Sequence, residues 1–402
     1  MAIINGIFNT NLNPAELNTR SFAGTILRLF PNGSAPLFAL SSQVGKSKAL
    51  SSTHGYFSKT MTFITTTSTS GDLVGATTLT VGSTANMQPD MVLHNVRTRE
   101  NIKIVSVASP TTVTVVRAFG RVPAAALNAA DKLIHIGTAF IEGSSRPNAR
   151  QLATVYVSNF TQIFRNAWGL TDTARASMAE MGYSNVAESR KDCSLFHSTD
   201  IESAIIFGQA KMDTTGSQPV HSTQGIIDAI YQYAPSNINP AGATTSYSQL
   251  VALVEEAFTY STDMSNSKER IGFADALAMK VLTDIGRKSG QIQIMQDETS
   301  FGMQFTSFKF YKGTINLIEH PLLNGLDPTA GRLLVVDMPA VKLAYMDGRD
   351  TKAEEYDSKG KQSSGGGIDG VGGSLTTEMA VELINPFSCA YVSGLTAGVA
   401  DV

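Results

Sequence analysis

The sequence is poor in charge. Charged residues make up 16% of its 402 positions, whereas an average soluble protein has about 25%. Threonine, serine, glycine and alanine fill the difference. A neutral surface of this kind suits extensive protein–protein contact, because the cores of interfaces are depleted in charge. A Thr-rich secreted protein would have the same composition, so composition alone leaves both interpretations open.

Runs of basic residues are also missing. The net charge is −3, and no stretch of five to eight residues is rich in lysine or arginine. A protein that grips nucleic-acid phosphates is expected to carry a basic stripe. The sequence therefore argues against direct DNA binding, but it permits DNA to be confined without being bound.

Cysteine is scarce as well. Cys193 and Cys389 lie far apart and form neither a CxxC pair nor a zinc spacing, so we expect two reduced, packed thiols. The N-terminus lacks the basic and apolar parts of a signal peptide, and no apolar run reaches the ~20 residues that a membrane helix needs. These absences predict a soluble protein, made in a cytoplasm, with no membrane partner.

Catalytic and metal-binding motifs are absent too. No GxSxG elbow occurs, and the adjacent carboxylates of Glu255-Glu256 and Glu354-Glu355 do not face one another on a helix. We therefore predict no catalytic, cofactor-binding or metal-binding residues and no cofactor. The histidines fit neither HExxH nor another metal spacing; they are His54, His94, His135, His197, His221 and His320.

Three further motifs have little functional meaning in their context. Gly45-Lys46-Ser47 imitates the end of a P-loop, but Leu40 occupies the place of the required first glycine. Gly365-x-Gly367-x-x-Gly370 matches the dinucleotide fingerprint but follows a polar loop, without the preceding strand that the fingerprint needs. The sequons at Asn32 and Asn159 would stay unmodified in a cytoplasm.

The N-terminal part predicts segments that cannot bury themselves. Residues 1–45 carry little periodicity, apart from a short helical stretch at 15–30. Residues 56–67 are rich in threonine and aromatic residues and predict one long strand. An arm this long must lie on another surface, either its own or that of a neighbour.

Residues 71–137 predict a separate small β unit. Short strands at 8–12-residue spacing, divided by Gly and Pro turns, favour a barrel or sandwich. Strand-prone sequence resumes at 138–142 and 152–164, so the unit interrupts a longer hairpin. The predicted strands are 78–81, 91–97, 102–107, 112–117 and 132–136.

The remaining chain mixes helices and strands. A helix at 173–181, capped by Asp172 or Thr173, precedes a long, partly buried helix that Asn185 can cap. Residues 220–340 form an α/β part. Its apolar stripes lie at 250–258, after the candidate cap Ser248, and at 274–285, and its strands at 305–311, 314–318 and 333–337.

The C-terminal part is expected to close the fold. Residues 341–346 alternate as a strand, and residues 347–374 lose periodicity and become charged and then Gly-rich. The β-prone runs 375–384 and 387–393 flank Asn385-Pro386 and predict a closing hairpin.

Several short stretches in a fixed order carry a family resemblance. They are Pro89-Asp90-Met91-Val92, residues 100–107, Arg117-Ala118-Phe119-Gly120, Glu142-Gly143, residues 159–165, Thr173-Ala174-Arg175-Ala176, residues 333–337 and Leu343-Ala344-Tyr345. Together with the order of the elements, they resemble tailed-phage major capsid proteins of the Hong Kong 97 fold, and within these the SU-ten-like family. The resemblance spans most of residues 1–395.

The resemblance implies an α+β capsid fold with named parts. The N-terminal arm would be residues 1–50, and the E-loop hairpin residues 51–71 and 138–160, with a small all-β insertion at 72–137. The P-domain, including the spine helix, would be residues 161–219 and 341–402. The A-domain would be residues 220–340.

The resemblance also implies function and partners. The chain would be a major capsid protein that forms hexamers and pentamers of an icosahedral shell around double-stranded DNA, in a virion assembled in the bacterial cytoplasm. Its partners would be copies of itself, a portal protein, a separate scaffolding protein and, in some particles, a decoration protein. No residues indicate the lysine–asparagine crosslink known in this fold. Two alternatives stay open: a phage tail or baseplate protein, and an α/β enzyme with a β insertion.

Overall fold

A computed structural model describes residues 46–59, 63–177, 185–289, 299–300, 303–304, 306–325, 330–356 and 370–399. The chain divides into two compact units: Phe57–Val157, and the two flanking parts Met1–Tyr56 and Ser158–Val402. Helices and strands are mixed in the second of these, which confirms the predicted α+β class. The predicted arm helix at 15–30 lies outside the described residues.

The unit Phe57–Val157 is built around a closed six-stranded barrel. The strand order is β3-β8-β5-β6-β7-β4, and a bridge between Ser68 and Val81 joins the first strand to the last. The strands predicted between residues 78 and 136 are confirmed, and they form a barrel. Its strands are β3 (Thr65–Thr67), β4 (Thr78–Thr80), β5 (Met91–Asn95), β6 (Asn101–Ser109), β7 (Thr112–Val116) and β8 (Lys132–Thr138).

Alternating apolar residues fill the barrel. Side chains at every second position of a strand point to the same face, and here that face is the interior. β-Branched residues suit this packing; they are four of the nine residues of β6 and all five of β7. The buried core includes Leu79, Leu93, Ile102, Ile104, Val113, Val115 and Leu133.

Two buried carboxylates hold the loops at one end of the barrel. Glu100 accepts hydrogen bonds from Arg117 Nε and Nη2, both at 2.8 Å, and from the backbone N–H groups of Ala118 and Ala125. Burial alone would raise the pKa of Glu100, but these hydrogen bonds outweigh burial and hold its pKa below the ordinary value. Asp131 accepts from Arg97 Nε at 2.6 Å, and this bond is the main reason that its pKa is lowered.

The prediction of one long strand at 56–67 is wrong, because two separate strands contribute to this range. Strand β2 (Thr53–Ser58) pairs with β9 (Val155–Phe160), whereas β3 begins at Thr65 in the barrel. The two strands belong to different sheets, and the described residues between them, 59, 63 and 64, form no strand. The second half of the predicted hairpin is also interrupted, because β8 ends at Thr138 and residues 139–154 form no strand.

A five-stranded sheet is assembled from segments far apart in the sequence. Its order is β1-β20-β22-β10, and β21 also pairs with β22. Strands β10 and β22 pair antiparallel over ten positions, from Gln162↔Met379 to Thr171↔Gly370. The strands are β1 (Lys46–Ala49), β10 (Gln162–Thr171), β20 (Val341–Met346), β21 (Lys352–Tyr356) and β22 (Gly370–Leu383).

The prediction that residues 347–374 are irregular is confirmed for 347–351 and is wrong for 352–356 and 370–374. Lys352–Tyr356 and Gly370 onward form strands, and residues 357–369 lie outside the described part. The glycines belong in the strand because neighbouring backbone comes very close. A Cβ on Gly373 would lie 2.6 Å from the carbonyl oxygen of Glu354, and one on Gly370 would lie 2.5 Å from that of Leu170.

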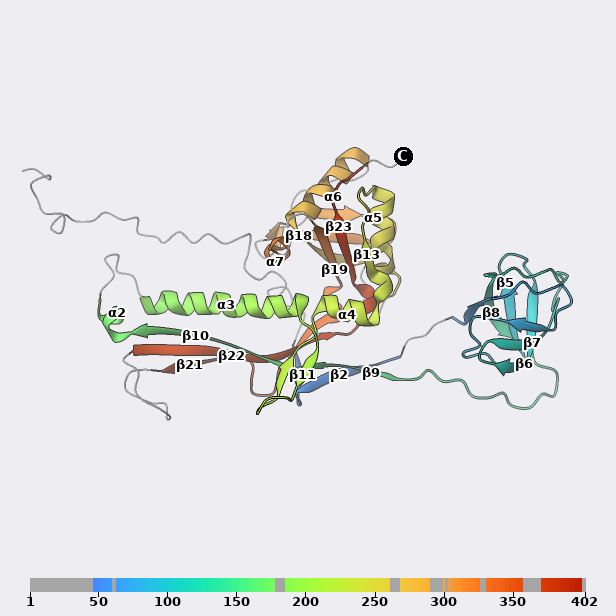
Figure 1. Cartoon of the computed structure of the whole chain (residues 1–402), viewed down its shortest axis with the longest axis horizontal. Coiled ribbons are helices and arrows are strands. Elements are labelled where there is room, and N and C mark those ends of the chain that lie inside the picture. Colours follow the sequence, from blue (N-terminus) through green and yellow to red (C-terminus); the bar gives the residue numbers. More distant parts are fainter. Residues whose placement is uncertain are drawn as a thin grey trace, which may run out of the picture. The chain divides into compact units, whose positions relative to one another are not determined.

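Helix α3 (Asn185–Phe207) is the long, partly buried helix that the sequence predicts. It lies along the ribbon formed by β10 and β22, as Figure 1 shows. Its buried side includes Ile201 and Ile205. The short helix α2 (Asp172–Ala176) is capped by Thr171, whose side chain accepts from the N–H of Ala174, and not by Asp172 or Thr173.

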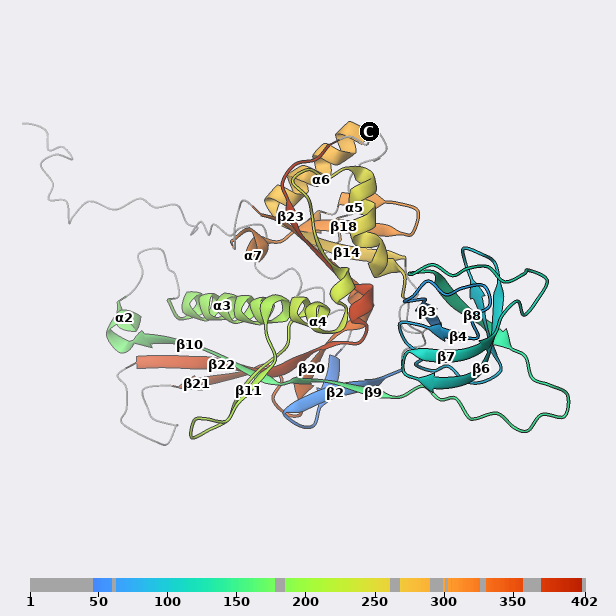
Figure 2. The same ribbon diagram turned by 45° about the vertical axis from the view of Figure 1, so that its right-hand side comes forward.

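The α/β part forms a six-stranded sheet with the order β13-β23-β19-β14-β18-β17. Helices α5 (Tyr247–Val254) and α6 (Ala276–Ser289) pack on this sheet through one apolar core, and Figure 2 shows them beside it. Ser246 caps α5 in a capping box with Gln249, so the predicted cap Ser248 is wrong. The strands are β13 (Ile238–Pro240), β14 (Glu269–Ala274), β17 (Thr306–Lys309), β18 (Thr314–Glu319), β19 (Gly331–Val336) and β23 (Ala390–Leu395).

The predicted closing hairpin is wrong. Strand β22 lies in the five-stranded sheet and β23 in the six-stranded sheet, and the two do not pair. The short 3-10 helix Pro386–Ser388 carries the chain from one sheet to the other. The β-prone residues Ala390–Leu395 therefore pair with strands of the 220–340 region. Helix α4 (Ile226–Tyr233) shares a core with α3 and both sheets.

Candidate assembly surfaces

Four of the histidines, His54, His94, His197 and His320, form hydrogen bonds with polar side chains in different parts of the fold. His54 Nε2 lies 2.9 Å from Glu382 Oε2, and His320 Nε2 lies 2.8 Å from Glu202 Oε1. His197 is buried between Asn166 and Thr377, and burial lowers its pKa. Among the described residues, no group of three or more His, Cys, Asp or Glu side chains could hold a metal ion.

The motifs that imitate phosphate loops have other roles in the fold. Lys46 and Ser47 lie in strand β1, where Lys46 pairs with Asp350 at 2.8 Å and Ser47 donates to Glu382 at 2.7 Å. A P-loop would need a helix to begin here. Gly370 begins strand β22, and Gly365 and Gly367 lie outside the described residues.

The paired carboxylates and the cysteines also have structural positions. Glu255 accepts a hydrogen bond from Tyr311 and pairs with Lys312, and Glu355 pairs with Arg190 at 2.8 Å. Both cysteines are buried free thiols. The described residues therefore bring no nucleophile, base and orienting group together.

The sequon at Asn159 is a structural anchor. Its side-chain N–H groups donate to Thr223 Oγ1, the carbonyl of Gln224 and the carbonyl of Val381, and its Oδ1 accepts from the N–H of Gln224. Thr161 is also buried and donates to Glu378 at 2.9 Å. In the sequence, this stretch is a sequon and part of the family resemblance. Its buried hydrogen bonds join residues more than sixty positions apart and therefore become evident only in the fold.

The β2–β9 hairpin is held at its base and exposes apolar side chains farther along. Tyr56 donates to the carbonyl of Leu383 at 2.7 Å, and burial raises its pKa. Beyond this anchor, Phe57 is 74% exposed and contacts Tyr156, with 5.0 Å between ring centroids. Val155 and Tyr156 are exposed as well, so this pair of strands presents a cluster of apolar side chains, and such a cluster marks a surface that another protein covers.

Residues 139–154 continue this exposed character. They have no regular secondary structure, and nearly all of them are exposed. Ile141 is 73% exposed, and Phe140 and Leu152 are also exposed. A polypeptide of this length that has few contacts of its own needs another surface to order it.

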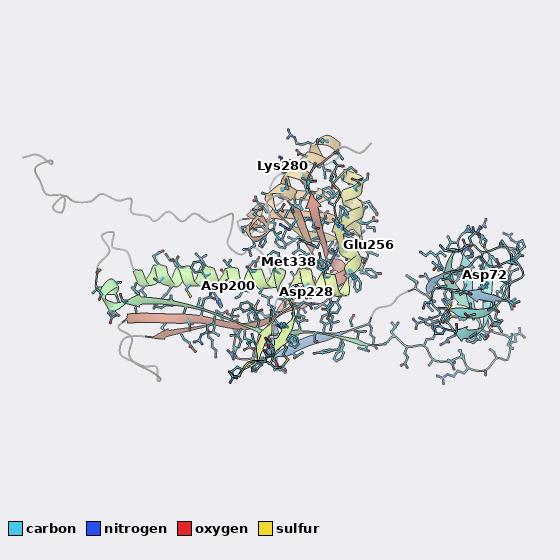
Figure 3. The ribbon with its side chains drawn as sticks, in the orientation of Figure 1. Asp72, Asp200, Asp228, Glu256, Lys280 and Met338 are labelled. Atoms are coloured by element: carbon cyan, nitrogen blue, oxygen red, sulfur yellow. The ribbon has the colours of Figure 1, made fainter. Side chains whose placement is uncertain are left out.

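Strand β10 has one covered face and one open face. Asn166 bonds to His197 and Asp200 on α3, and Trp168 lies 5.1 Å below the guanidinium of Arg190, so this face meets the helix. Asp200 is labelled on α3 in Figure 3. The alternate side chains Ile163, Arg165 and Ala167 are exposed. On the side away from β22, β10 has no strand partner among the described residues.

These surfaces can be buried by protein but are not built for catalysis. Long exposed segments, an open strand edge and exposed aromatic side chains offer backbone hydrogen bonds and apolar area to a neighbour. None of the helices in the described part of the chain is long and apolar enough to cross a membrane.

Comparisons with known proteins agree with this character. The family model for the SU10 major capsid protein matches residues 5–396. The "Major capsid protein" of Pseudomonas phage PaMx41 is 50% identical over 405 residues, covering 98% of this chain and 97% of that protein. Among solved structures, Mycobacterium phage Adephagia gives 9% identity and a TM-score of 0.48, with 96% of each chain covered. Microbacterium phage Oxtober96 gives 10% identity and a TM-score of 0.49, with 96% of this chain and 97% of that chain covered.

Proposed function

The chain belongs to the SU10 major capsid protein family and is a structural protein of a phage head, not an enzyme; on this premise we propose that its copies form the hexamers and pentamers of an icosahedral shell around double-stranded DNA. The match of the family model over residues 5–396 carries the proposal. Head-to-tail contacts that close by rotation produce rings of this kind. Family membership sets aside the tail, baseplate and enzyme alternatives.

We assign the capsid parts as follows. The N-terminal arm is residues 1–50, the E-loop is residues 51–71 and 138–160, and the barrel at 72–137 is its insertion. The P-domain is residues 161–219 and 341–402, and the A-domain is residues 220–340. The β2–β9 pair supports the E-loop, and the length of α3 supports a spine helix. Ala390–Leu395 is the exception within 341–402: we assign it to the A-domain, because β23 pairs with β13 and β19.

The shell requires other components. We assign as partners a portal protein, a separate scaffolding protein during assembly in the host cytoplasm, and, where the head needs reinforcement, a decoration protein. The packaged DNA is confined without specific binding. The low overall charge supports this, because a surface with few cations lets the duplex slide and condense.

Electron microscopy tests the proposal. The full chain is expressed in bacteria with the scaffolding protein encoded beside it, and the pelleted material is imaged. We expect closed shells with five-fold and six-fold clusters. Only small soluble species, in repeated preparations of well-folded protein, would contradict the proposed assembly.

A further inference from the structure

Charge is distributed unevenly between the two units. The unit Phe57–Val157 contains nine Lys and Arg residues against five Asp and Glu, whereas the rest of the chain contains 22 against 29. The nearly neutral total therefore hides a basic unit and an acidic remainder. Surfaces of opposite sign attract and orient one another before contact.

Within the barrel, exposed cations gather at one end. Strand β8 runs from Lys132 to Thr138, and Thr67 pairs with Lys132, so the segments that follow β3 and precede β8 share the Lys132 end. The N–H of Val96 donates to the carbonyl of Lys132, which places the β5–β6 turn there as well. The chain leaves the barrel at the opposite end of β8.

The buried carboxylates bring three arginine- and lysine-bearing segments together at this end. Arg99 precedes Glu100 in its turn, and Arg121 lies in a loop whose two sides both donate to Glu100. Lys132 follows Asp131, which is held by Arg97. Arg99, Arg121 and Lys132 are all exposed, and no acidic side chain in the described part of the chain pairs with them.

Apolar side chains lie beside these cations. Arg117 Nη1 donates to the carbonyl of Leu73 at 3.2 Å, so the segment of Leu73 and Val74 is fixed at the same end. Leu73 is 79% exposed, and Val74 and Val96 are also exposed. We call Leu73, Val74, Val96, Arg99, Arg121 and Lys132 the basic end of the barrel.

This composition favours a protein partner. Arginine beside apolar side chains is typical of protein interfaces. Single-stranded nucleic acid would need aromatic platforms for stacking, and the one exposed aromatic side chain in the loop of Arg121, Phe119, already has Lys103 Nζ 5.6 Å from its ring centroid. The carboxylate next to Leu73 in the sequence, Asp72, does not pair with these cations. It is labelled on the barrel in Figure 3, is partly buried, and accepts a hydrogen bond from Ser70 Oγ at 3.0 Å.

We infer that the basic end of the barrel docks on the acidic remainder of a second copy of this chain and so links neighbouring subunits. The inference rests on the proposed assembly function and adds to it the surface and the partner. The excess of seven carboxylates over cations outside the barrel unit supplies the complementary charge. The protruding apolar side chains then exclude water around the ion pairs.

Charge reversal is the first test. The full chain carrying Arg99→Glu, Arg121→Glu and Lys132→Glu is expressed with its scaffold, beside a matched control with Lys211→Glu, Lys280→Glu and Arg287→Glu, three exposed cations outside the barrel unit, which changes the net charge of the chain equally away from the basic end. We expect about a tenfold lower yield of pelleted shells for the first variant and little change for the control. Circular dichroism confirms that both variants fold.

The outcomes separate the two proposals. Absence of shells from the unmodified chain would contradict the assembly function itself. Shells of equal yield and equal resistance to 0.5 M salt from both variants would overturn the inference and leave the assembly function standing. The same loss in both variants would also overturn it, because it would reflect net charge and not the basic end.

Crosslinking identifies the partner directly. Shells assembled from a mixture of ¹⁵N-labelled and unlabelled chains are treated with a water-soluble carbodiimide, which joins the Lys132 amine to a contacting carboxylate. We expect peptides that join a labelled Lys132 to an unlabelled carboxylate outside residues 57–157. Links only within one chain, or retention of a double-stranded DNA oligonucleotide that the charge-reversed variant loses, would overturn the inference.

Discussion

The barrel and the five-stranded sheet solve the same packing problem with different parts of the chain. All strands of the barrel come from one continuous stretch, Thr65 to Thr138, and the sheet closes on itself. The five-stranded sheet needs Lys46–Ala49, Gln162–Thr171 and three strands from beyond residue 340. The barrel is complete once its own sequence is made, whereas the sheet is complete only when the last strand is in place.

This difference separates local from global stability. Short-range contacts close small loops and form quickly, while contacts between distant segments pay the entropy of long loops first. Substitutions in the barrel should therefore lower the stability of the barrel alone. Substitutions in the five-stranded sheet should loosen strands drawn from the whole chain.

The largest effect is expected from Arg117→Met. The substitution leaves the Glu100 carboxylate buried without its charged partner, which costs about 4 kcal/mol. Hydrogen exchange of the full chain should rise in peptides of β6 and β7 and stay unchanged in β20. Arg121→Met is the control, with an effect within about 0.5 kcal/mol. Equal exchange in β20 and β6 would show that the two regions are not independent.

Asn159→Asp should destabilise the strands outside the barrel and leave the barrel unchanged. An aspartate brings oxygen where Asn159 Nδ2 donates to three acceptors, so we expect a loss of about 3 kcal/mol. Exchange should rise around β9, β10 and β22, with the barrel strands unaffected. The exposed Asn148→Asp carries the same charge change and should have no effect. Protection retained in β22 would rule out the anchoring role of Asn159.

Gly373→Ala should have a smaller effect on the same sheet. The added methyl would meet the Glu354 carbonyl at 2.6 Å and Trp168 Nε1 at 2.8 Å, and relief of this crowding costs about 2 kcal/mol. Gly169→Ala, on the paired strand, meets nothing within 4 Å and is the control. Thermal unfolding of the two variants, each against the unmodified chain, measures the difference. Equal melting temperatures would mean that β21 moves aside for the added methyl group with no loss of stability.

The smallest effect is a dependence on pH. Burial lowers the pKa of His197 below its ordinary 6.5 in the folded state. The unfolded chain then binds the proton first, so this stability is present above about pH 6.5 and is lost as the pH falls toward the folded-state pKa. His197→Gln should flatten the exchange of β10 between pH 7 and pH 5.

The matched control is His135 on β8, whose pKa burial also lowers. His135→Gln should flatten the pH dependence of the barrel amides and leave that of β10 intact. The lowered pKa of Asp131 keeps its pair with Arg97 through this range, since that contribution is lost only below about pH 4. A response shared by both regions would contradict their separation.

The same contrast explains what the sequence predicts well. The barrel strands follow from alternation and turn residues, which are local properties. The glycines at 370, 372 and 373 looked irregular because the reason for them is the backbone of Leu170, Trp168 and Glu354, which approaches from elsewhere in the chain. Strand β14 was missed because Glu269, Arg270 and Gly272 interrupt its apolar run, and its place is fixed by its neighbours β18 and β19. The choice of sheet for β23 depends on strands more than fifty residues earlier.

The candidate surfaces were less predictable. Phe57 and Phe164 both occur in strand-like sequence, yet the first is 74% exposed and the second is in the core. Sequence periodicity indicates that a side chain will be covered, but not whether its own chain covers it. The basic end escaped notice for a related reason, because its cations are spread over residues 99–132 and meet only through Glu100 and Asp131.

Closure of the barrel has a consequence for crowding in the shell. A shell holds many copies of one chain at very high local concentration, where any unpaired strand edge is a template for wrong joining. The bridge between Ser68 and Val81 removes both edges of the barrel sheet. The barrel therefore contacts its neighbours through side chains and not through strand pairing. Pairing with a strand of another copy is open to β10, which has a free edge among the described residues.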